Sequence, residues 1–175
     1  MSTTKEPPQE EESTTFVRPP KKTNWQLIAI RSGIAAVVTI LVCVFLFRPM
    51  IINGESMQPT YSGKGFTFAF LPYFKLYSPQ RKQIVILKHA GFNPFLLKRV
   101  LALPGEVVEI RNGVLYVNGS AVDEPYVKNP CDWNFARHEV PKGKIFVLGD
   151  NRSMPMQQHM GGMIDQDRLA GVPLW

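Results

Sequence analysis

The sequence predicts a mainly β fold, in which a β-rich domain follows a single N-terminal transmembrane helix. Two observations predict this organisation. The apolar residues gather in one nearly unbroken block from Ile28 to Phe47. Beyond that block, short runs of β-branched and aromatic residues alternate with turns rich in Gly, Asn and Pro. No long helical periodicity follows the block, so strands are expected to build the rest of the chain.

Three segments are expected along the chain. Residues 1–24 are rich in Ser, Thr, Pro, Glu and Lys, and their small apolar surface cannot offset the entropy lost on ordering, which predicts a disordered tail. Residues 25–47 are predicted to form one helix, long enough at about 1.5 Å per residue to cross the roughly 30 Å of bilayer hydrocarbon. Residues 48–175 are then the β-rich domain.

A cleaved export signal is the alternative interpretation of residues 25–47. Such a signal has a shorter apolar core and a small-x-small cleavage site soon after it. Here Arg48-Pro49-Met50 follows the core, which favours a retained anchor. Arg48 is the basic residue at the carboxyl end, whereas the amino end carries Arg18, Lys21, Lys22 and Arg31. The positive-inside rule therefore predicts a single-pass protein of the cell membrane, with a cytoplasmic N-terminus and residues 48–175 on the exported side.

The net charge of +6 is compatible with either nucleic acid or anionic lipid as a partner. Because the first 22 residues carry four basic and four acidic side chains, the surplus lies in the membrane flanks and the domain. With a membrane segment present, we expect the lipid bilayer as a partner and no nucleic acid. Cys43 lies inside the apolar block and Cys131 far outside it, so neither a disulfide nor a metal cluster is expected.

Turn and strand signals can be placed within residues 48–175. The Asn112-Gly113 pair predicts a hairpin turn, because these residues adopt positive φ readily, and Asn118-Gly119 predicts the next turn. A run of aromatic residues is expected partly in the core and partly dipping into the membrane, with most of it in the core because a strand buries one face: Phe66, Phe68, Phe70, Tyr73, Phe74 and Tyr77. Strand-like runs lie at residues 50–52, 67–71, 83–87, 107–110, 114–117 and 144–148.

The first candidate for chemistry is Ser56, in the segment Gly-Glu-Ser-Met-Gln-Pro-Thr that directly follows the anchor and a short apolar strand. A serine between a strand and a Pro-containing turn can present its Oγ to solvent, with nearby backbone N–H groups free to bind an oxyanion. The same pattern is also common in ordinary turns. By itself it does not distinguish a nucleophile from a turn residue.

The second candidate is Lys98, in the apolar run Leu-Leu-Lys-Arg-Val-Leu-Ala-Leu-Pro-Gly-Glu. Burial disfavours the charged amine and lowers its pKa from near 10.4. A neutral amine can remove the proton of a serine hydroxyl. The alternative is that Lys98 points to water from the polar face of a half-exposed strand.

The third candidate segment is a strand that runs into a turn, Phe-Val-Leu-Gly-Asp-Asn-Arg over residues 146–152. Alone it indicates only a turn with local hydrogen bonds. The combination is more specific: Ser-Met-x-Pro-Thr beyond an anchor, then Lys-Arg-Val-x-x-x-Pro-Gly-Glu, then Gly-Asp-Asn-Arg. In this order the three motifs resemble the type I signal peptidase (leader peptidase) family, and the resemblance covers nearly all of residues 48–175.

The resemblance implies a serine endopeptidase that removes signal peptides from exported preproteins at small-x-small (Ala-x-Ala) sites, without metal or other cofactor. Ser56 is then the nucleophile and Lys98 the general base, a dyad without histidine. It implies an oxyanion held by the Ser56 amide, because Gly54 stands where some relatives have a hydroxyl. An extended substrate adds as a strand, and the residues implied to contact it are Ile52, Gly54, Met57, Phe95 and Leu97.

The chain departs from the family pattern after the third motif. Where the family usually continues x-x-Ser-x-Asp-Ser-Arg, its serine falls on Pro155, its aspartate on Gln157 and its arginine on His159. Ser153 is the candidate to supply the missing hydroxyl beside the lysine. Candidates to pair with Arg99 in place of the family's acid are Asp165 and Asp167.

Other interpretations remain. His159, within the divergent segment, is the strongest rival general base, and His89 and His138 are expected in polar surface or loop positions. If the altered third motif has abolished catalysis, the chain is a membrane-anchored β domain that binds peptides without cutting them. A relative that matures one dedicated pilin-type substrate would share all three motifs.

Overall fold

The computed structural model describes residues 24–89, 95–129, 131–159 and 161–174. Apart from Asn24, the predicted disordered tail lies outside the described residues. The first element is helix α1 (Trp25–Leu46), and it has no buried residue. By length and composition α1 is able to cross a membrane, and it is the one such helix in the described part of the chain. The predicted helix, 25–47, is one residue longer, because Phe47 begins strand β1.

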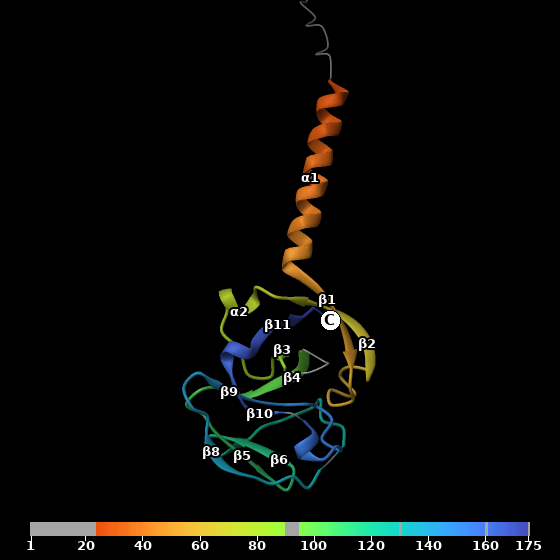
Figure 1. Ribbon diagram of the computed structural model, residues 1–175. Helices are drawn as coiled ribbons and strands as arrows, with labels where there is room; N and C mark the ends of the chain where they lie inside the picture. The colour runs from red at the N-terminus through yellow and green to blue at the C-terminus, as the bar shows by residue number, and fades with distance from the viewer. Residues whose placement is uncertain (1–23, 90–94, 130, 160, 175) are drawn as a thin grey trace, which may run out of the picture. The chain divides into compact units, whose positions relative to one another are not determined.

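The rest of the described chain is built on two antiparallel sheets, and the predicted mainly β fold is confirmed (Figure 1). The four-stranded sheet has the order β7-β6-β5-β8, with β5 (Val107–Arg111), β6 (Val114–Val117), β7 (Ser120–Ala121) and β8 (Phe135–Glu139). The seven-stranded sheet has the order β1-β2-β11-β3-β4-β9-β10, with β1 (Phe47–Asn53), β2 (Lys64–Phe70), β3 (Ile84–Lys88), β4 (Phe95–Ala102), β9 (Lys144–Leu148), β10 (Gly162–Asp165) and β11 (Leu169–Pro173). Short helical turns are α2 (Tyr73–Leu76), η1 (Met156–His159) and η2 (Gln166–Arg168).

The predicted hairpin is present between β5 and β6. Asn112 and Gly113 have φ of 46° and 80°, and Asn118 and Gly119 repeat the pattern at the next turn with 53° and 82°. All the strand-like runs of the sequence fall on strands. The sequence did not predict β7, β8, β10 or β11, whose runs are short or mix polar with apolar residues.

The apolar core lies on both faces of the central strands. One buried cluster joins β5 and β6 to β9, and a second lies among β3, β4 and β9. A third cluster connects β1 and β2 with β3 and β4, and contains Met50, Met57, Ala69, Ile86 and Leu97. This third cluster supports the strands that carry the candidate residues.

The expectation that the aromatic run is mostly core is wrong. In β2, Thr67 and Ala69 are fully buried, whereas Phe66 on the opposite face is 52% exposed. Because side chains alternate along a strand, the small residues of β2 face inward and its phenylalanines face outward. None of the six aromatic residues is fully buried, and Tyr77 beyond α2 is also exposed.

Candidate active site

Ser56 lies in a compact turn that directly follows β1. Gly54 begins the turn with φ of 146°, a conformation that glycine adopts more readily than other residues, and its N–H donates to the carbonyl of Gly63 at 2.9 Å. The Tyr61 N–H donates to the carbonyl of Met57 at 2.9 Å. Met57 is 2% exposed and packs in the core, which fixes the turn in place. The neighbouring Ser56 is therefore held at the edge of the core.

Lys98 comes from the middle of β4 and is 2% exposed. Its Nζ donates to Ser56 Oγ at 2.7 Å, so the structure brings the two predicted dyad residues together. Burial lowers the pKa of Lys98 to about 8, and the nearby Asp150 carboxylate opposes part of that shift. The alternative that Lys98 points to water does not fit this burial.

Asp150 pairs with Arg99, the residue next to Lys98. Arg99 Nε and Nη2 donate to the two Asp150 oxygens at 2.8 and 2.6 Å, a bidentate arrangement. The pair forms because Arg99 lies opposite Leu148 in the β4–β9 register and Asp150 follows soon after β9. The expectation of Asp165 or Asp167 as the partner is wrong, since Asp165 instead binds Lys144 at 2.6 Å.

The same turn holds the backbone of the serine. Asn151 N–H donates to the carbonyl of Ser56 at 3.0 Å, and Asn151 Nδ2 donates to the carbonyl of Glu55 at 3.1 Å. Ser153 Oγ donates to Asn151 Oδ1 at 2.6 Å, which fixes the orientation of the amide. The expectation that Ser153 supplies a hydroxyl beside Lys98 is therefore wrong, because this hydroxyl is exposed and binds Asn151.

His159 is fully buried, and both of its ring nitrogens bind the backbone. Gly149 N–H donates to Nδ1 at 3.2 Å, and Nε2 lies 2.6 Å from the carbonyl oxygen of Asn151. Burial, with the positive charge of Lys98 nearby, lowers the pKa of His159 to about 4. With both nitrogens occupied, His159 is not placed to take a proton from Ser56. His138, another histidine of the chain, lies on strand β8 and is exposed.

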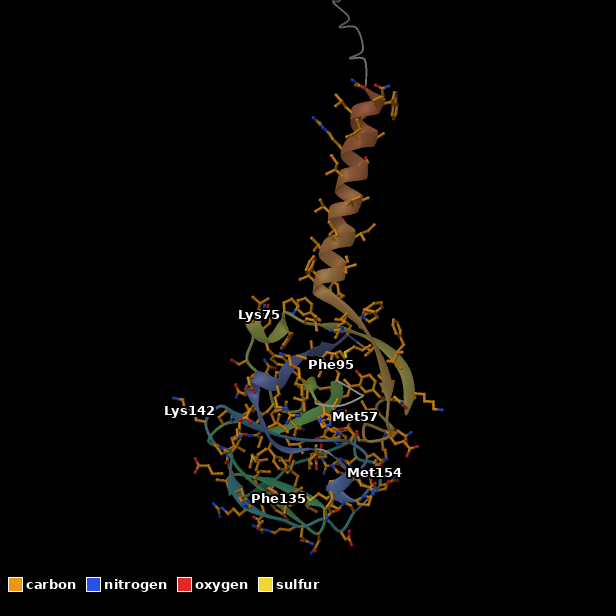
Figure 2. All side chains as sticks on the ribbon, viewed as in Figure 1. Met57, Lys75, Phe95, Phe135, Lys142 and Met154 are labelled. Atoms are coloured by element: carbon orange, nitrogen blue, oxygen red, sulfur yellow. The ribbon has the colours of Figure 1, made fainter. Side chains whose placement is uncertain are left out.

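A groove of about 320 Å³ lies beside Ser56, between β1 and the beginning of β4. β1 is an edge strand, and β9 pairs with β4 only from Arg99 onward. Two strand segments with unpaired edges therefore border the groove within the described residues. Figure 2 shows Met57 and Phe95, both of which line it. Its lining includes every residue that the resemblance implied for substrate contact: Ile52, Gly54, Met57, Phe95 and Leu97.

Two further groups bear on the site. Within the described residues, no acceptor is bound to the Ser56 backbone N–H, which leaves it available to an incoming oxygen. Thr60 Oγ1 donates to Asp150 Oδ2 at 2.5 Å, so the Ser-x-x-Pro-Thr turn also contacts the Gly-Asp-Asn turn. The sequence contained the signal for Thr60 and Asn151, because both belong to the quoted motifs, but it did not show that the two turns touch.

Comparisons with known proteins address the family of the chain. Residues 24–174 match the family described as signal peptidase, peptidase S26. A signal peptidase I of Bacillus licheniformis is 35% identical over 150 residues, which cover 79% of this chain and 81% of that protein. Signal peptidase IB of Staphylococcus aureus (strain COL) is 33% identical over 160 residues, covering 81% and 83%. A solved signal peptidase I from Enterococcus faecalis V583 is 31% identical with a TM-score of 0.46, covering 55% of this chain and 97% of that one. The chain belongs to the signal peptidase family, peptidase S26.

Proposed function

We propose that this member of the family cleaves signal peptides from exported preproteins by a serine–lysine dyad. The observation that carries the proposal is the 2.7 Å contact between Lys98 Nζ and Ser56 Oγ in a buried setting. An amine with a pKa of about 8 is partly neutral near physiological pH. It can therefore act as a general base, which a lysine with an ordinary pKa does far less often.

In the first step, neutral Lys98 removes the Ser56 hydroxyl proton while Oγ attacks the scissile carbonyl carbon. The carbonyl π electrons move to its oxygen, and the Ser56 N–H donates to that oxyanion. The intermediate collapses, the C–N bond breaks, and the Lys98 ammonium protonates the departing amine. The resulting ester is hydrolysed by water, whose proton Lys98 removes, and the proton then returns to Ser56 Oγ.

We propose that the groove receives the residues before the cleaved bond as an extended strand. Backbone groups of β1 and of Phe95–Leu97 in β4 are the candidates to pair with the added strand. The lining is mostly apolar and lies next to Ser56, which suits small apolar side chains such as those of an Ala-x-Ala site. Ile52, Met57 and Leu97 are the residues proposed to limit side-chain size.

The proposed setting is the cell membrane, with α1 as the anchor, a cytoplasmic N-terminus and an exported catalytic domain. Basic residues are concentrated at the amino end of α1, which supports this orientation. Exposed apolar residues of the domain, among them Phe66 on β2, suit contact with lipid. A substrate anchored in the bilayer by its own apolar segment would be cleaved close to the membrane.

The test is cleavage of a model preprotein by the full chain in detergent micelles. Ser56→Ala and Lys98→Ala are each expected to abolish cleavage, because one removes the nucleophile and the other its base. Ser120→Ala and Lys142→Ala make the same changes at exposed positions in the smaller sheet and a turn, and should retain activity. Full activity in either dyad variant would overturn the assignment.

Two additional measurements on the same protein distinguish two other functions. A peptide-binding domain without catalytic activity would bind the preprotein but form no acyl-enzyme at Ser56, which mass spectrometry of the mixed protein would detect. A peptidase dedicated to one pilin-type substrate would cleave that substrate and leave a panel of ordinary preproteins intact. The intact contact between Lys98 and Ser56 favours a peptidase over a binding domain without catalytic activity, and the substrate panel distinguishes a general peptidase from a dedicated one.

A further inference from the structure

His159 links the two ends of the Gly149–Asn151 turn through its imidazole. Nδ1 accepts the N–H of Gly149, and Nε2 lies 2.6 Å from the carbonyl oxygen of Asn151. Because a carbonyl oxygen only accepts hydrogen bonds, Nε2 must carry the proton and Nδ1 must be unprotonated. The neutral ring in a single tautomer therefore satisfies both backbone groups. A doubly protonated ring would place two N–H donors against each other at Gly149.

One end of the bridged turn holds the backbone of the candidate nucleophile. Asn151, whose carbonyl binds His159, donates its own N–H to the Ser56 carbonyl and its side-chain amide to the Glu55 carbonyl. Gly149, at the other end of the turn, also lies close to the Ser56 backbone. A Cβ built on Gly149 would lie 2.1 Å from the Ser56 carbonyl oxygen and 3.0 Å from His159 Nδ1. The turn, the imidazole and the serine backbone are therefore in direct contact.

Asp150, the middle residue of the turn, places a negative charge near Lys98, the candidate base. Asp150 holds the guanidinium of Arg99, which follows Lys98 on β4. A turn that moved would shift Asp150 relative to the amine as well as the Ser56 backbone. One three-residue segment thus affects both members of the pair.

We propose that His159 is a positioning residue for the Ser56–Lys98 pair, acting through the Gly149–Asn151 turn. This inference rests on the proposed function. His159 lies at the end of η1, in the segment after the third motif, so the role is assigned by its contacts and not by its place in a motif. It is not a catalytic residue, because both of its nitrogens are bound to backbone groups away from the Ser56 hydroxyl.

The surroundings of the ring favour the neutral form that this role requires. The charged groups near it are Lys98 on β4, and Arg152 and Asp150 from the segment after β9. Two of these three are positive, and the Trp133 ring packs against the imidazole in a T-shaped arrangement with 4.6 Å between the centroids. A cationic imidazole would be desolvated among mostly positive neighbours.

The experiment compares His159→Phe, His159→Gln and the control His138→Phe in the full chain. Phenylalanine fills the volume of the ring but makes neither hydrogen bond. Glutamine can place an amide N–H near the position of Nε2 and keep the bond to Asn151. His138→Phe makes the same change at an exposed histidine of the smaller sheet. Preprotein cleavage gives kcat and KM, and hydrogen exchange gives the protection of the Asn151 amide.

We expect His159→Phe to lower kcat roughly 10- to 100-fold, since a small misplacement of reacting groups has effects of that size. KM should stay within about twofold, because the groove is unchanged. His159→Gln should recover part of kcat, and His138→Phe should behave as the wild type. The Asn151 amide should exchange faster in His159→Phe than in the wild type.

Three results would overturn the role: an unchanged kcat in folded His159→Phe, a change in KM alone, or a loss of kcat that disappears on cooling well below the unfolding temperature. If His159→Phe does not fold, His159→Ala, which also makes neither hydrogen bond, decides, and a wild-type kcat together with wild-type exchange at Asn151 in that variant would reject the proposal. If neither the wild type nor His138→Phe cleaves any preprotein, the proposed function fails. Exchange at Asn151 then tests the His159 bridge by itself.

Discussion

Lys98 Nζ contacts Ser56 Oγ at 2.7 Å although 42 residues separate the two along the chain. The contact joins the turn after β1 to the middle of β4, two strands that are not neighbours in the sheet. Its geometry requires that the amine lose its proton before the serine can attack. The first prediction follows from that requirement.

Activity is expected to rise with pH through about 8, the pKa of Lys98. Below that pKa the fraction of neutral amine falls roughly tenfold per pH unit, so kcat/KM should fall in proportion. The measurement is kcat/KM for a model preprotein between pH 6 and pH 10. Lys98→Arg, which stays charged throughout, should be inactive at every pH. A flat profile in the wild type would contradict the assignment of Lys98 as the base.

Asp150→Asn is expected to move the acidic limb of that profile to lower pH. The carboxylate raises the pKa of Lys98, so its removal lowers that pKa further. The same change leaves the buried Arg99 guanidinium without its anion, and should reduce the free energy of unfolding by about 3–5 kcal/mol. Asp165→Asn, which removes an exposed ion pair with Lys144, is the control and should change neither quantity appreciably. Unfolding in denaturant and the pH profile provide the two measurements.

Gly149→Ala is expected to reduce kcat by about 100-fold, because the new methyl group would collide with the carbonyl oxygen of Ser56. The displaced backbone should also lower the free energy of unfolding by roughly 1–3 kcal/mol. Gly65→Ala is the matched control, since its nearest neighbour is a movable Ser62 hydroxyl at 3.3 Å. Steady-state kinetics and thermal unfolding test both variants. Equal kinetics in the two would argue against the close approach at Ser56.

Ile52→Trp is expected to raise KM for the preprotein several-fold with little loss of stability. Ile52 lines the groove and is only partly buried, so a larger side chain there narrows the space for substrate without overpacking the core. Val114→Trp, at an exposed position on β6, is the control. The measurement is KM together with the unfolding temperature. If Ile52→Trp left KM unchanged while Val114→Trp raised it, the groove would not be the substrate site.

Stability is expected to fall as pH decreases from about 6.5 to about 4. His159 has a pKa of about 4 in the folded chain and 6.5 as an ordinary value, so the unfolded chain binds more protons in this range and acid favours unfolding. Over the full range the contribution is about 2–3 kcal/mol. His159→Phe should flatten this part of the stability profile, and His138→Phe should not. Denaturant unfolding at several pH values measures it.

Local patterns in the sequence were sufficient to predict the anchor helix, several of the strands and the residue types that can do chemistry. A long apolar block is sufficient to predict α1, and the Asn-Gly pairs are sufficient to place the turns of the smaller sheet, because both signals are local. The identity of Ser56 and Lys98 as candidates came from the order of three motifs. The direction of the β2 phenylalanines was predicted wrongly, because alternation alone does not say which face of a strand meets the core.

The partners that support the Ser56–Lys98 pair could not be predicted from the sequence and are known from the folded structure. Arg99 binds Asp150 instead of Asp165 because the β4–β9 register brings the Gly-Asp-Asn turn to the end of that pairing. Asn151 donates to the carbonyls of Ser56 and Glu55 through contacts between segments that are remote in sequence. Such contacts depend on strand register and close packing, which are properties of the folded chain as a whole and have no local signature in the sequence.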